Sequence, residues 1–271
     1  LTENVSVANS MTPAQFDSTR ASTLTEHQSG PGVLRGQVWL TIQTRQAQQL
    51  VRGRNGTPEK PAITGLVGFA NKLRVIWQAA RNDDPYADWW LIKVHETLDS
   101  TRQLIKKRQT EVETVLDQMA SMDIAVAESS RPYRVPLRFA NPYAYQGARL
   151  IAEYDTLVRT VLTGTHVGLI DRETSDGFLK LCTRKIRGAF ALPQDYRFLG
   201  IDREAVRKGT GKAAQAANFM GVVPEDVMSG ELRAPLVPRK LQFPKGSADH
   251  IGLTPISKSE SPRLQTTNDD G

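Results

Sequence analysis

The stretch Gln37-Val38-Trp39-Leu40-Thr41-Ile42-Gln43-Thr44-Arg45 decides how the folded part of this chain begins. Apolar and polar side chains alternate along it, with Val38, Leu40 and Ile42 on one face. Such a period of two is typical of a strand that buries one face. The stretch therefore predicts a half-buried strand whose other face is polar and carries Trp39, Thr41, Gln43 and Arg45.

Beyond this strand the apolar residues recur mainly at helical spacing. They predict helices over about 45–52, 62–81, 143–162 and 173–191. A longer helix is expected from Pro85 to Met119, because Asp84 fits an N-cap and proline fits the first helical position. A seven-residue apolar repeat follows this helix and favours packing inside the fold or in a helical hairpin over a free-standing coiled coil: Leu91, Leu98, Ile105, Val112 and Met119.

Period-two patterning returns after Met122. Ile124 and Val126 form one candidate strand, and Tyr133 to Phe139 form another, in which Pro136 argues for an edge position. The fold class expected is therefore mainly α with a small β component (α+β), containing a long helical hairpin.

The ends of the chain differ in composition from its middle. Residues 1–36 are rich in Ser, Thr, Gln and Asn, and residues 224–271 are rich in Pro and Ser. We expect two flexible tails around a core over residues 37–223. No run approaches the roughly 20 apolar residues of a membrane span, and residues 1–31 lack the pattern of a secretory signal, so we expect a cytoplasmic protein with no membrane contact.

Positive charge is concentrated near the first strand. The chain has a formal net charge of +6. Residues 37–81 alone contain seven basic residues (Arg45, Arg52, Arg54, Lys60, Lys72, Arg74 and Arg81) and one acidic residue, Glu59. This concentration suggests a polyanionic partner, although scattered charges on solvated helices are the alternative.

The sequence contains no arrangement typical of catalysis or metal binding. The segment from Lys208 to Lys212 resembles a phosphate-binding loop, but Val206 and Ala213 occupy positions where that motif needs a glycine and a hydroxyl. The acidic residues and histidine near position 90 have no nucleophile in a recognisable motif, and Cys182 lies in an apolar surrounding that suits a small buried side chain. We therefore expect no enzyme activity, no cofactor and no metal.

A polar strand beside a basic helical unit suggests DNA recognition, because a two-stranded ribbon fits the major groove. Thr41, Gln43 and Arg45 are the candidate base-reading residues. The second strand could come from a twin subunit or from Tyr133 to Phe139, and an ordinary edge strand with a wet face is the alternative. The candidate phosphate contacts are Arg52, Arg54, Lys60, Lys72, Arg134 and Arg138, with Lys180, Arg184 and Arg187 forming either a second phosphate surface or a solvated helix face.

Several longer strings carry a family resemblance. They are Leu40-Thr41-Ile42-Gln43-Thr44-Arg45-Gln46-Ala47, Gly65-Leu66-Val67-Gly68-Phe69-Ala70-Asn71, Asp83-Asp84-Pro85-Tyr86-Ala87-Asp88-Trp89-Trp90 and Arg134-Val135-Pro136-Leu137-Arg138-Phe139-Ala140-Asn141-Pro142-Tyr143. With them the chain from Val38 to Leu236 resembles a family of integrating-conjugative-element proteins, which is similar to the AcaB-type regulators of conjugative plasmids.

This resemblance implies a ribbon-helix-helix-like core and a sequence-specific regulator of transfer genes that binds double-stranded DNA. We expect it to be a homodimer. A non-catalytic structural or adaptor protein of the conjugation machinery, binding its partner through helix 85–119, is the alternative.

Overall fold

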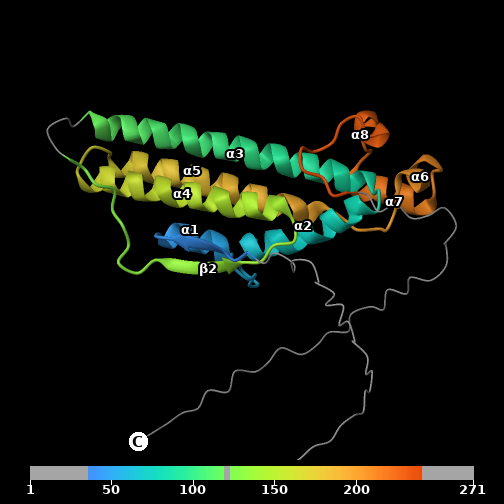
Figure 1. Cartoon of the computed structure of the whole chain (residues 1–271), viewed down its shortest axis with the longest axis horizontal. Helices are drawn as coiled ribbons and strands as arrows, with labels where there is room; N and C mark the ends of the chain where they lie inside the picture. The colour runs from blue at the N-terminus through green and yellow to red at the C-terminus, as the bar shows by residue number, and fades with distance from the viewer. Residues whose placement is uncertain (1–35, 119–122, 240–271) are drawn as a thin grey trace, which may run out of the picture. The chain divides into compact units, whose positions relative to one another are not determined.

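The computed structural model describes residues 36–118 and 123–239. Within them the protein is mainly helical with one two-stranded antiparallel sheet, which confirms the predicted α+β class. The predicted tail residues 1–35 and 240–271 lie outside the described residues. The elements are β1 (Val38–Ile42), α1 (Arg45–Arg52), α2 (Leu66–Arg81), α3 (Pro85–Asp117), β2 (Tyr133–Leu137), α4 (Pro142–His166), α5 (Arg172–Ala191), the 3-10 helix η1 (Leu192–Asp195), α6 (Arg203–Arg207), α7 (Gly211–Met220) and α8 (Glu225–Ser229) (Figure 1).

Polar side chains fix the starts of the three longest helices. Asp84, Asn141 and Asp171 stand directly before α3, α4 and α5, and each accepts a hydrogen bond from a backbone N–H of the first turn. Pro85 and Pro142 occupy positions in which no backbone donor is needed. The start predicted for the long helix is thereby confirmed.

α2 begins later in the sequence than predicted, because the loop between α1 and α2 is longer than expected. Arg54 and Ile63 are joined by two backbone hydrogen bonds of 2.8 Å, so the chain folds back on itself between them. Gly65 then passes close to the end of α1, where a Cβ would lie 2.4 Å from the nitrogen of Gly53. The helix predicted from about residue 62 therefore begins only at Leu66.

The two strands form a ribbon within one chain. β1 pairs with β2 in an antiparallel register that sets Val38 opposite Leu137 and Ile42 opposite Tyr133. Of the two origins considered for the second strand, the structure contains the one from the same chain. Leu40 and Ile42 are buried on the inner face, as the alternation of β1 predicted, and Leu137 of β2 is buried with them. Val38 was predicted on the same face but is 44% exposed, so the prediction was wrong for that residue.

The candidate strand over Ile124 and Val126 does not form. The backbone N–H of Ala127 donates to Thr163 Oγ1 at 3.0 Å, and the backbone oxygen of Ala127 accepts from Arg159 Nε at 2.8 Å. This segment is therefore held by side chains of α4 rather than by a neighbouring strand, and the period-two prediction was wrong here.

α3 lies parallel to α4, whereas α4 and α5 form an antiparallel pair (Figure 1). Arg102 on α3 contacts Glu153 at 2.9 Å, and Gln109 contacts Thr160 at 3.0 Å, so both helices advance by seven residues in the same direction. The described positions of the seven-residue repeat, namely Leu91, Leu98, Ile105 and Val112, are buried in the common core. This confirms packing inside the fold.

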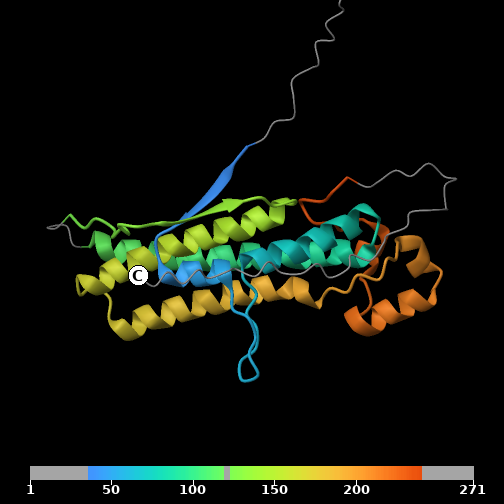
Figure 2. The same ribbon diagram turned by 90° about the horizontal axis from the view of Figure 1, so that it is seen from below.

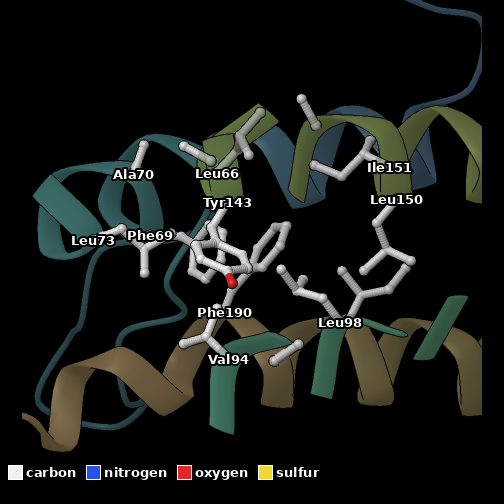
Figure 3. Packing of buried hydrophobic residues seen from close by; sticks show 14 of the residues in the cluster. Leu66, Phe69, Ala70, Leu73, Val94, Leu98, Tyr143, Leu150, Ile151 and Phe190 are labelled. Atoms are coloured by element: carbon white, nitrogen blue, oxygen red, sulfur yellow. The ribbon is translucent and has the colours of Figure 1, made fainter. Parts of the chain in front are cut away.

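The core is built by side chains from α2, α3, α4 and α5 (Figure 3). Phe69 and Phe190 stack with ring centres 4.7 Å apart. Gly147 of α4 passes so close that a Cβ would lie 2.7 Å from the Phe69 ring. Among residues 36–118 and 123–239, no helix combines the length and apolar content that crossing a membrane requires.

The fold extends past the boundary expected at residue 223. Val227 and Met228 of α8 are buried, and the Arg203 guanidinium of α6 donates to the backbone oxygen of Val227 at 3.2 Å. Residues 224–239 therefore include part of the packed structure rather than only a flexible tail. The sequence did not predict this packing, because the apolar run that contains Val227 and Met228 is too short to show a helical period.

Candidate nucleic-acid interface

The outer face of the ribbon is exposed and combines a hydroxyl, a cation and an aromatic ring. The register sets Thr41 opposite Arg134 and Trp39 opposite Pro136. Side chains directly opposite in an antiparallel pair share one face. The guanidinium carbon of Arg134 lies 5.1 Å from the centre of the Trp39 ring, and 47% of Trp39 is exposed. Arg134 is thus held across the ribbon while its donors stay accessible.

The carboxylate of Asp155 fixes the junction between β1 and α1. It accepts hydrogen bonds from the backbone N–H of Gln43 at 2.8 Å, from that of Thr44 at 2.9 Å and from Thr44 Oγ1 at 2.6 Å. Thr44 Oγ1 in turn accepts from Ala47 N and caps α1. Asp155 is buried on α4, so its hydrogen bonds tie the junction between β1 and α1 to that helix. The sequence signal was an acidic residue within the apolar face of a predicted helix, and our reading of the sequence missed it.

The three candidate base-reading residues have different surroundings. Thr41 is exposed on the ribbon, and Arg45 is exposed as the first residue of α1. Gln43 lies just beyond the end of β1 and is half-buried, and its Oε1 accepts a hydrogen bond from the backbone N–H of Ser129 at 3.0 Å. The structure therefore brings Thr41 together with Arg134, while Gln43 helps to hold the 123–132 segment.

Two further candidate phosphate contacts accompany the ribbon. The guanidinium carbon of Arg52 lies 5.2 Å from the centre of the Tyr133 ring at the start of β2. Arg138 follows the end of β2 and is exposed. With Arg134, these residues place three cations on or next to the ribbon.

The other predicted phosphate contacts lie elsewhere. Arg54 and Lys60 belong to the 53–65 loop, which projects from the side of α1 away from the ribbon (Figure 2). Arg54 Nη2 donates to the backbone oxygen of Pro61 at 3.0 Å and so braces this loop. Lys72 is half-buried on α2 and lines a separate groove with Phe198 and Phe219.

The acidic cluster near the start of α3 is structural. Asp84 caps the helix and accepts a hydrogen bond from the Tyr196 hydroxyl at 2.7 Å, and burial raises the pKa of Asp84 to about 6. Asp88 is fully buried and pairs with Arg203 at 2.5 Å. Cys182 is buried, as predicted, and burial raises the pKa of its thiol to about 11. Within the described ranges, no group of three or more His, Cys, Asp or Glu side chains could hold a metal ion.

The comparisons with known proteins place this ribbon-bearing helical chain among transcriptional regulators. A family model described as "Transcriptional regulator AcaB" matches residues 30–240, so the chain belongs to the AcaB family. No curated protein matched the sequence.

A solved structure, selenomethionine-containing AcaB from uropathogenic E. coli, is similar in fold, with a TM-score of 0.51. It is 15% identical in sequence, and the match covers 72% of this chain and 95% of that one. At this identity the likeness concerns the fold alone.

Proposed function

We propose that this transcriptional regulator is a sequence-specific DNA-binding protein that controls transfer genes of a conjugative element and reads the major groove with the β1–β2 ribbon. The observation that carries the proposal is the exposed outer face on which Thr41 and Arg134 lie opposite each other. The major groove of B-DNA admits a two-stranded ribbon, and arginine can donate two hydrogen bonds to guanine. Membership of a family of transcriptional regulators supports a role in regulation, and the ribbon is the surface that we propose contacts DNA.

Within this proposal, Thr41 and Arg45 approach base edges directly. Gln43 can read a base with its amide NH2 group, or with its oxygen once the Ser129 N–H has been released. Arg134 lies on the ribbon itself, and Arg52 and Arg138 lie beside it, where the phosphates of the flanking strands would pass. Arg54, Lys60 and Lys72 are more distant phosphate contacts.

The proposal includes a homodimer with strand–helix–helix units arranged as in ribbon-helix-helix proteins. β1, α1 and α2 follow in that order, and within the described residues β1 is paired along one edge only. A second copy could align with the free edge of β1 and place two ribbons on symmetric half-sites.

The test is capture of DNA fragments from the protein's own mobile element, followed by salt titration of the recovered fragment against random duplex. A specific regulator enriches one promoter-like fragment and binds random duplex far more weakly. Thr41→Ala and Arg45→Ala should relax the base preference, whereas Arg54→Ala should weaken binding to every sequence alike.

Lys106→Ala is the matched control, because Lys106 is exposed on α3, away from the ribbon. An unchanged consensus and affinity in the ribbon variants would show that the protein reads DNA through another surface. Equal weak binding of all fragments by the unaltered protein would reject sequence-specific regulation.

A further inference from the structure

A groove between α1 and α5 gathers donors beside the ribbon. Its lining includes Gln46 of α1, Tyr154 of α4, and Lys180, Thr183, Arg184 and Arg187 of α5. Seen from below, α1 lies between the ribbon on one side and α5 on the other (Figure 2). A ligand bound along the ribbon therefore meets this groove on the far side of a single short helix.

The cations of the groove are incompletely neutralised. Asp176 pairs with Lys180 at 3.5 Å. Among the residues that the structure describes, no carboxylate oxygen forms an ion pair with Arg184 or Arg187. Two guanidinium groups thus face one groove without a counter-charge from the described chain.

The surroundings of Arg187 distinguish it from an ordinary solvated cation. The side chain is half-buried, and its Nε is buried without a hydrogen-bond partner among the described residues. A buried donor without a partner is unfavourable, so an acceptor that reached Nε after a small shift of the side chain would be bound favourably. The hydroxyl groups of Tyr154 and Thr183 lie 2.7 Å apart, and only one of their two hydrogens is used between them. When Tyr154 donates, the hydroxyl hydrogen of half-buried Thr183 is left for a bound oxygen.

We propose that the α1–α5 groove is a phosphate-binding site that takes a backbone phosphate of the same duplex whose bases the ribbon reads. This inference rests on the proposed function and extends it from the ribbon to α5. Phosphate oxygens accept strong, charge-assisted hydrogen bonds from arginine. The 53–65 loop, which carries Arg54 and Lys60, projects on the α5 side of α1 and would continue the same cationic path (Figure 2).

The test compares groove and ribbon variants in salt titrations of the captured fragment and of random duplex. Arg184→Ala and Arg187→Gln should each weaken binding to both duplexes about tenfold. Each should also lower the slope of log affinity against log salt by about 0.9, because one phosphate contact is lost. The base preference should stay unchanged, unlike in Thr41→Ala.

The control is the double variant Lys106→Ala/Lys107→Ala, which removes two exposed cations from α3. Arg184 is exposed, so its replacement tests the groove even where Arg187→Gln lowers stability. Groove variants that behave like this control, while Thr41→Ala still changes the preference, would overturn the groove site and leave the proposed function standing. Failure of the unaltered protein to bind any duplex would overturn both.

A final experiment distinguishes whether the groove binds a backbone phosphate of DNA or a small phosphorylated ligand. Without DNA, inorganic phosphate is compared with chloride at equal ionic strength in thermal unfolding. A rise in Tm that is lost in Arg187→Gln, together with unchanged DNA binding by that variant, would assign the groove to a free phosphate compound and overturn the duplex proposal. The expected result is a negligible shift in Tm and weaker DNA binding.

Discussion

Replacing Arg203 should destabilise the whole fold, although the residue lies outside the four helices of the core. Its guanidinium donates to Asp83 Oδ1, to Asp88 Oδ2 at 2.5 Å and to the backbone oxygen of Val227 at 3.2 Å. Arg203 is 5% exposed and Asp88 is fully buried. Arg233 also contacts Asp88, but only at 3.4 Å. Without Arg203, the buried carboxylate therefore keeps one distant cation.

The magnitude follows from the burial of Asp88. Removing one partner of a buried ion pair costs about 3–5 kcal/mol, because the remaining charge is left uncompensated. We expect Arg203→Met, which keeps much of the aliphatic packing, to lower the free energy of unfolding by that amount. One kcal/mol corresponds to roughly 2–4 °C for a body of this size, so Tm should fall by about 10 °C. Asp88→Asn in the same background removes the uncompensated charge and should restore about half of the loss.

Urea unfolding of the two single variants and the double variant measures this coupling. Lys208→Met is the control, because its ion pair with Glu204 at 2.6 Å lies on the surface, where solvent screens it, and should contribute little to stability. A loss below about 1 kcal/mol in Arg203→Met, or simple additivity with Asp88→Asn, would refute the argument that Arg203 compensates a buried charge.

Three further outcomes follow from particular contacts. Burial raises the pKa of Asp84 from 3.8 to about 6, so its contribution to stability is full below pH 3.8 and is lost as pH rises through 6. The free energy of unfolding of Asp84→Asn, measured in urea, should therefore rise by up to about 3 kcal/mol relative to that of the unaltered protein as pH increases from 4 to 7. A difference in free energy that does not change with pH would contradict this. Gly65→Ala should cost at least about 1–3 kcal/mol in thermal unfolding, because the added methyl would lie 2.4 Å from the Gly53 nitrogen, whereas Gly177→Ala on open α5 surface should be neutral or stabilising. Asp155→Ala should leave donors at the start of α1 unsatisfied, and hydrogen exchange at β1 should rise while α3 stays protected. Equal protection of β1 in Asp155→Ala and in the unaltered protein would argue against a role of Asp155 as an anchor.

Much of the fold could be predicted because its signals are local. Alternation placed β1 and β2, and Asp84 with Pro85 placed the start of α3 to the residue. The seven-residue repeat correctly indicated a buried seam. It could not show that α3 runs parallel to α4, because a repeat identifies an apolar face and not the direction of its partner.

The exposure of the candidate interface was predictable from the sequence, but its long-range contacts were not. The sequence indicated exposed Thr41 on a strand beside basic residues, but it could not show that Gln43 bonds to the 123–132 segment. That contact spans 86 positions, and the one between Tyr196 and Asp84 spans 112. Pairings over such separations depend on the final packing, and no spacing rule along the chain encodes them.

The pairing of β1 with β2 also has a kinetic consequence. β1 is synthesised before β2, which follows only after α1, α2 and α3. At roughly 5–20 residues per second, a ribosome needs on the order of 5–20 s to add the roughly ninety residues between them. Closing so long a segment is entropically costly unless the intervening helices have already packed. Pairing of β1 with β2 is therefore favoured once α1, α2 and α3 have packed, and a chain that ended before residue 133 would lack the ribbon that we propose reads DNA.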